Sequence, residues 1–163
     1  QAPRRRPPLS SNVRPHSPAP MPALRFPEHF PPTDRWNRFF IGVRWLGPDL
    51  SFFKELKATQ GQRDAAAMKA WGGGERQAVA ADVSRVLAEQ LCWKSAYFLP
   101  EDSAAVAFHG PRFDFCDPES ALEVVVETMK TKHQLFPPES FWRNHGDNTM
   151  GTLIDSLLQR GEA

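Results

Sequence analysis

The stretch "DPESALEVVVETMKTKHQLFPPESFW", residues 117–142, carries the clearest helix start and stop signals in the chain. Asp117 can accept hydrogen bonds from the free N–H groups of a first helical turn, and Pro118 is typical of the first helical position. Glu119 is favourable at the positive end of the helix dipole. Basic residues gather in the last turn: Lys130, Lys132 and His133. The stretch therefore predicts a helix that begins at Asp117 or Pro118 and ends before the turn at Pro137.

Apolar residues at helical spacing predict the buried faces of three main helices. After Asp117 they are Leu122, Val125, Val126 and Met129. In "ERQAVAADVSRVLAEQLCW", residues 75–93, they are Val79, Val83, Val86, Leu87 and Leu91. In "TMGTLIDSLLQR", with Asn148 or Thr149 as the cap, they are Leu153, Ile154, Leu157 and Leu158. With a short helix expected at "ESFW", the fold class predicted for residues 75–160 is a mainly α-helical bundle.

The N-terminal part divides into two further regions. Residues 1–32 hold ten of the sixteen prolines and few apolar residues, which predicts a disordered tail rich in Pro and Arg. Met21 is an alternative start for the native chain. Residues 33–74 are predicted to be an aromatic-rich helical segment that ends in the glycine linker 72–74. Its aromatic residues belong either to the core, which their helical spacing favours, or to a patch that docks a partner.

Residues 94–116 are predicted to be a long connection. Pro100, Gly110 and Pro111 interrupt any regular element there. Within it, "AAVAF" at 104–108 is a candidate for a short strand.

Charge and composition exclude several function classes. Residues 1–20 contain four arginines and no acid, so the remaining chain carries a net charge of −3. From Glu75 onward there are 14 acidic residues against 8 Lys and Arg, which argues against a nucleic-acid interface. No apolar run is long enough to span a membrane and no secretory signal is recognisable, so we expect a cytoplasmic location. Cys92 and Cys116 lack a CxxC spacing and are expected to be small apolar residues, with a disulfide or a metal site as the alternative.

No motif predicts catalysis. The segment "FHGPRFDFCD" brings together His109, Asp114, Cys116 and Asp117, but it has no recognised nucleophile signature. The spacing of His109, Cys116, His133 and His145 does not match a zinc site. Gly72, Gly73 and Gly74 lack the lysine and the hydroxyl residue of a phosphate-binding loop. We therefore expect no enzyme and no metal.

The order of these segments resembles that of acyl and peptidyl carrier proteins over about residues 75–160. "VSRVLAEQLCW" is similar to the end of the first helix in that family, and Phe136-Pro137 is similar to the hydrophobic-Pro pair that ends the second. "TMGTLIDSL" is similar to the Thr-hydrophobic-Gly start of the family's last helix. The resemblance implies an acyl-carrier-like helical bundle whose acidic second helix docks basic protein surfaces.

The attachment motif departs from the family pattern. Carriers hold phosphopantetheine on a serine directly after Asp, at the start of the second helix. Here Pro118 follows Asp117, and Ser120 comes two residues late with Ala121 after it. A small group of bacterial proteins with this helical layout lacks the serine, and this chain is similar to that group. Ser120 is therefore the cofactor-binding candidate only if the chain is a true carrier.

Protein interaction is the function that the sequence favours. Acidic residues bracket the second helix: Glu101, Asp102, Asp114, Asp117, Glu119, Glu123 and Glu127. The predicted partner-binding residues among them are Asp114, Asp117, Glu119, Glu123 and Glu127, which would steer a partner with a basic surface. A plain solvated acidic face is the structural alternative. The functional alternatives are a phosphopantetheine-dependent carrier modified on Ser120 and an immunity protein that neutralises a bacterial toxin.

Overall fold

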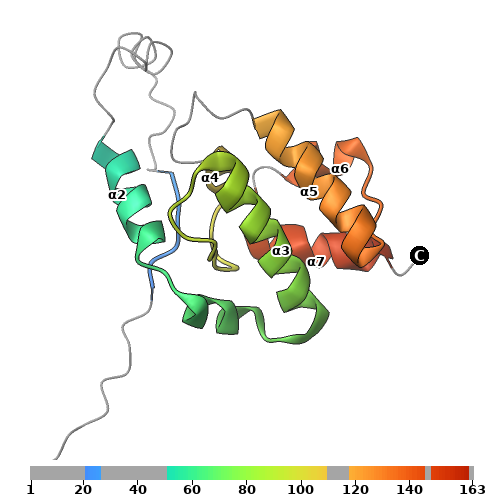
Figure 1. The fold of residues 1–163 in the computed structure, drawn as a ribbon, viewed down its shortest axis with the longest axis horizontal. Coiled ribbons are helices and arrows are strands. Elements are labelled where there is room, and N and C mark those ends of the chain that lie inside the picture. The colour runs from blue at the N-terminus through green and yellow to red at the C-terminus, as the bar shows by residue number, and fades with distance from the viewer. Residues whose placement is uncertain (1–20, 27–50, 110–117, 146–147, 162–163) are drawn as a thin grey trace, which may run out of the picture.

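The computed structural model describes residues 21–26, 51–109, 118–145 and 148–161, which form a mainly helical bundle (Figure 1). The described helices, in chain order, are α2 (Ser51–Gly61), the 3₁₀ helix η2 (Ala65–Trp71), α3 (Gly74–Leu91), α4 (Ala104–His109), α5 (Pro118–His133), α6 (Glu139–His145) and α7 (Met150–Gly161). The predicted helical fold class is thereby confirmed. The first part of the aromatic-rich segment predicted over 33–74, residues 33–50, lies outside the described residues, as do Asp114, Cys116 and Asp117.

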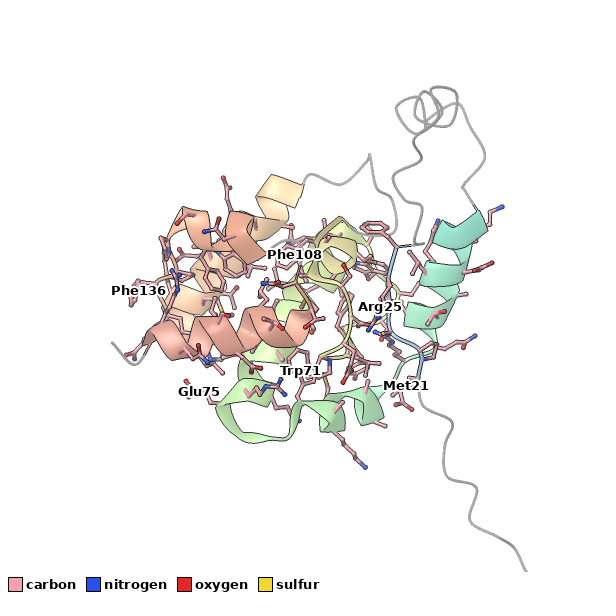
Figure 2. The ribbon with its side chains drawn as sticks, turned by 180° about the vertical axis from the view of Figure 1, so that it is seen from behind. Met21, Arg25, Trp71, Glu75, Phe108 and Phe136 are labelled. Atoms are coloured by element: carbon pink, nitrogen blue, oxygen red, sulfur yellow. The ribbon has the colours of Figure 1, made fainter. Side chains whose placement is uncertain are left out.

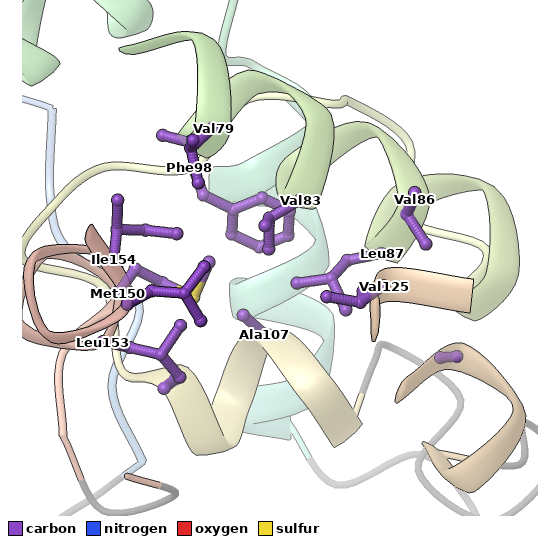
Figure 3. Close-up of a cluster of buried hydrophobic side chains, with 14 of the residues drawn as sticks. Val79, Val83, Val86, Leu87, Phe98, Ala107, Val125, Met150, Leu153 and Ile154 are labelled. Atoms are coloured by element: carbon purple, nitrogen blue, oxygen red, sulfur yellow. The ribbon is translucent and has the colours of Figure 1, made fainter. Parts of the chain in front are cut away.

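Helices α3 and α5 pack most extensively against each other and form the centre of the bundle, with α7 crossing near one end of α3 (Figure 1). Leu87 of α3 lies beside Val125 of α5 in the core, and Phe98 lies between α3 and α7 (Figure 3). Removing such side chains from water is the main favourable term in folding, so this cluster accounts for most of the stability of the bundle.

The helix predictions for the three main helices are confirmed. Helix α5 begins at Pro118 and ends at His133, and the predicted apolar face of α3 is buried throughout. In α5, Val125 and Met129 are fully buried, whereas Leu122 and Val126 are only partly buried. These two partly buried residues border a groove on the surface.

Capping explains where α7 and η2 start or stop. The Thr152 N–H donates to Thr149 Oγ1 at 3.2 Å, so Thr149 is the N-terminal cap of α7, one of the two residues predicted for this role. Asp64 caps η2 through the Ala66 N–H at 2.8 Å. Gly72 ends η2 with φ of 81°, a left-handed conformation that glycine adopts without steric cost. Residues 65–71 are thus helical as predicted, but with 3₁₀ geometry.

Residues 104–108 are helical, so the expected short strand is wrong. Ser103 starts α4, because its carbonyl accepts the Ala107 N–H at 3.1 Å. Trp93 Nε1 donates to the Ala107 carbonyl at 3.0 Å and ties α4 to the end of α3. Every residue of "AAVAF" is apolar, so alternation alone could not separate strand from helix; packing against α3, α5 and α7 decided it.

Residues 21–26 pack against the bundle, so this part of the segment 1–32 is not the disordered tail that the sequence predicts, and residues 1–20 and 27–32 lie outside the described residues. Leu24 is fully buried, and its backbone pairs with the loop before α4. The Leu24 N–H donates to Asp102 Oδ1 at 2.7 Å, and the Ser103 N–H donates to the Leu24 carbonyl at 2.9 Å. The apolar residues of this segment, Met21, Ala23, Leu24 and Phe26, lie among prolines in a stretch too short to give a periodic signal from which the contact could be predicted.

A buried ion pair between Arg63 and Asp102 joins four separate segments. Asp102 accepts from both terminal guanidinium nitrogens of Arg63 and from the N–H groups of Leu24 and Leu99. Arg63 Nη2 also donates to the Pro22 carbonyl at 2.8 Å. The Asp102 carbonyl accepts the Met150 N–H at 2.7 Å, so the start of α7 is held at the same point. Multiple hydrogen bonds are what make such a buried charge tolerable.

Gly151 lets α7 approach the Pro100 loop closely. Its N–H donates to the Pro100 carbonyl at 2.8 Å. A Cβ at this position would lie 3.0 Å from that same oxygen and 3.1 Å from Pro100 Cβ. The glycine of "TMG" is thus explained by packing at the start of α7.

Candidate docking surface on helices α5 and α6

The structure places only part of the predicted acidic docking set. Asp114 and Asp117 lie outside the described residues, and the side chain of Glu119 is not described. Glu123 and Glu127 are both exposed on α5, one helical turn apart. Among the described residues neither of these two carboxylates takes part in an ion pair.

Asp102, which the sequence grouped with this acidic set, lies in a different environment. It is fully buried and paired with Arg63, so it cannot meet a partner. Its neighbour Glu101 is exposed. The sequence does not indicate that the Asp102 carboxylate is buried, because its partner Arg63 lies 39 positions away along the chain.

A shallow groove of about 440 Å³ runs along α5 beside the start of α6. Its apolar wall consists of Leu122, Val126, Pro137 and Trp142. Its charged rim consists of Glu123, Glu127 and Lys130. The two exposed carboxylates of α5 therefore border an apolar surface rather than lying on a uniformly polar helix.

Aromatic residues extend the apolar character of this region. Phe136, next to Pro137, is 72% exposed and is the most exposed large apolar side chain among the described residues. Figure 2 shows it at the edge of the molecule. Trp142 packs edge-on against Phe141 and at a tilt against Phe108. Its buried indole N–H has no hydrogen-bond acceptor in the structure as described.

The C-terminal end of α5 is anchored to α3 by charge. Lys132 Nζ lies 2.9 Å and His133 Nε2 3.0 Å from carboxylate oxygens of Asp82, and Arg85 lies 2.8 Å from the same group. Partial burial, the largest single influence, raises the pKa of Asp82. Hydrogen bonds from Arg85, Lys132 and His133 together outweigh burial and lower the pKa to about 2.

Lys130 differs from the other basic residues of α5. It is exposed, lines the groove and forms no ion pair within the described part of the chain. Along α5 the groove rim therefore carries negative charge at Glu123 and Glu127 and positive charge at Lys130.

Ser120 is exposed and is the third residue of α5. The sequence predicts Pro118 at the first helical position, and α5 begins at Pro118, so Ser120 lies two residues after the start of the helix as predicted. Ser120, Glu123, Val124 and Glu127 follow one another at helical spacing on the solvent side of α5. The side chain of Ser120 therefore lies on the exposed face of α5.

The other functional features considered from the sequence are the cysteines, a metal site and a membrane span. Cys92, expected to be a small apolar residue, is exposed and has a free thiol. No three His, Cys, Asp or Glu side chains of the described ranges are grouped as a metal site requires. None of the described helices is both long and apolar enough to span a membrane.

No family model matches the chain, and no curated protein or solved structure is significantly similar to it. The function therefore has to be inferred from the residues of α5 and α6. Sequence reasoning identified Glu123 and Glu127 but missed the groove beside them. The sequence contains an indication of the groove, because Leu122 and Val126 form one edge of the apolar stripe of α5 and the apolar pair Phe136-Pro137 follows the helix.

Proposed function

We propose that this protein is a non-catalytic interaction module that docks a partner with a basic surface through the acidic face of α5. The observation that supports the proposal most is the position of Glu123 and Glu127. Both carboxylates are exposed, neither is paired within the described residues, and both border an apolar groove. Such carboxylates attract a basic surface over a distance, and adjacent apolar surface supplies contact affinity.

The helix order supports a carrier-like bundle as part of this proposal. Helices α3, α5, α6 and α7 follow one another as the resemblance to carrier proteins implies, with the acidic helix second. In such an arrangement α5 is the docking helix. Asp114, Asp117 and Glu119 belong to the same predicted acidic set and precede Glu123 in the chain, but the structure does not describe their side chains.

A charge-reversal pair tests the proposal. The Glu123→Lys/Glu127→Lys protein is compared with Glu75→Lys/Glu89→Lys, which makes the same change in net charge on exposed positions of α3. Affinity capture from the source organism, followed by cross-linking to locate the contact, should recover a basic partner with the native and α3-variant proteins but not with the α5 variant. Equal recovery by all three proteins would contradict the proposed surface. A captured secreted toxin would select the immunity function.

The exposed side chain of Ser120 in the first turn of α5 favours a second candidate, a phosphopantetheine-dependent carrier. The helix start offers a positive dipole end and free N–H groups to a phosphodiester. Intact-mass measurement after incubation with coenzyme A and a broad-specificity phosphopantetheinyl transferase tests it. A mass gain that disappears in Ser120→Ala would establish the carrier, and no gain would remove it.

A further inference from the structure

We infer that the groove between α5 and α6 receives an amphipathic helical segment of the partner, with an apolar anchor residue, basic residues at one end and an acidic residue at the other. This inference rests on the proposed function and specifies the chemistry of the partner. The inferred binding site differs from a general acidic patch in two ways. It requires the apolar wall of the groove, and it sets the direction of the bound segment.

The apolar side chains of the groove form a surface that can contact an apolar side chain of the partner. Leu122 and Val126 are one helical turn apart and only partly buried, and Pro137 and Trp142 face them across the groove. Apolar anchors in such a groove are the usual mode by which an amphipathic helix is bound. Truncating a residue that contacts the anchor should weaken binding strongly, whereas an exposed residue outside the groove should contribute little.

Charge order along the rim sets the direction. Glu123 and Glu127 precede Lys130 along α5, with Glu127 and Lys130 three residues apart, and all three line the groove. Lys132 and His133 do not line the groove, and the side chains of both contact Asp82 of α3. The basic end of the bound segment therefore lies beside Glu123 and Glu127, and its acidic end beside Lys130.

Trp142 supplies a local signal of occupancy. It lines the groove, and its buried indole N–H has no acceptor in the structure as described. A segment bound against Trp142 changes the surroundings of that N–H, so its nuclear magnetic resonance signal should shift. The Trp142→Phe variant assigns the signal among those of the five tryptophans.

The test uses the 163-residue chain and a synthetic probe. The probe is a helical peptide with leucine anchors on one face, two lysines at one end and two glutamates at the other. A second peptide has serine in place of the leucines. We expect the first peptide to shift the Trp142 signal and the serine peptide to bind at least about tenfold more weakly.

Protein variants separate the groove from the acidic patch. Val126→Ser changes the groove wall, and Val124→Ser is the matched control, because Val124 is exposed on α5 outside the groove. Val126→Ser should weaken peptide binding at least about tenfold and Val124→Ser less than about twofold. A nitroxide label on the basic end of the peptide should broaden signals near Glu123, and a label on the acidic end should broaden signals near Lys130.

Failure of the groove inference and failure of the proposed acidic surface give different results in these experiments. If Glu123→Lys/Glu127→Lys abolishes binding of peptide or native partner while Val126→Ser has no effect, the acidic surface stands and the groove inference is overturned. If none of these variants changes binding, both proposals fall. If the Trp142 signal shifts with protein concentration alone, the occupant is a second copy of this chain. If it shifts on replacing Arg4, Arg5 and Arg6 by serine, the occupant is the chain's own N-terminal part; either result overturns the inference.

Discussion

The ion pair between Arg63 and Asp102 makes the sharpest prediction for stability, and Asp102→Asn tests it. The substitution keeps the volume of the side chain but removes its charge. Both side chains are buried, so the charge of Arg63 is left without a counter-ion. The amide group also replaces one carboxylate oxygen, so at least one donor among Arg63, Leu24 and Leu99 loses its acceptor.

The expected loss is large. Breaking a buried ion pair by removing one partner costs about 3–5 kcal/mol, which is a large part of the roughly 5–15 kcal/mol that stabilises a typical domain. With a urea dependence of about 2 kcal/mol per molar, the midpoint of unfolding should fall by roughly 1.5–2.5 M. Because Asp102 also holds Leu24, the packing of residues 21–26 should be lost with it.

Urea unfolding followed by circular dichroism measures the change. Arg85→Met is the control, because Arg85 pairs with Asp82 at a half-exposed site, where an ion pair contributes about 0–1 kcal/mol. Arg63→Met alone and together with Asp102→Asn completes a double-mutant cycle. The double variant should be less destabilised than the sum of the single ones, by about 2 kcal/mol. A loss below about 1 kcal/mol for Asp102→Asn, or strict additivity, would refute the reasoning.

Three further changes test the packing and charge of the bundle. The pKa of Asp82 is lowered to about 2, so its ion pairs stabilise the fold fully above about pH 4, and this stabilisation is lost as the pH falls towards 2. Asp82→Asn should therefore lower the free energy of unfolding by at most about 2 kcal/mol at pH 6 and by less at pH 2.5. Urea unfolding at the two pH values measures the difference. Gly151→Ala should cost about 1–3 kcal/mol through contact with the Pro100 loop, whereas alanine at exposed Gln159 on the same helix should cost little; thermal melting compares them. Leu87→Ala should cost about 2–5 kcal/mol in urea unfolding because it leaves a cavity beside Val125, and an unchanged midpoint would contradict the described core.

The candidate site could be predicted from the sequence only in part. Glu123 and Glu127 fall on the polar side of α5, and helical spacing was enough to place them in solvent. The neighbouring groove depends on how α6 returns beside α5 after Pro137 and Pro138, which brings Trp142 to Leu122 and Val126. The apolar spacing of α5 indicates one side of the groove, but the approach of Trp142 depends on tertiary packing and is not encoded in that local spacing.

The sequence by itself determined the three main helices, because their signals are local. Caps and apolar spacing lie within a few residues of each other, as at Pro118 for α5, Thr149 for α7 and the valines Val79 and Val83 of α3. Only the tertiary structure decided that Leu24 belongs to the core and that Asp102 is a buried anchor rather than a surface acid. Their partners lie 78 and 39 positions away along the chain, and a contact over such a distance exists only once the helices have packed.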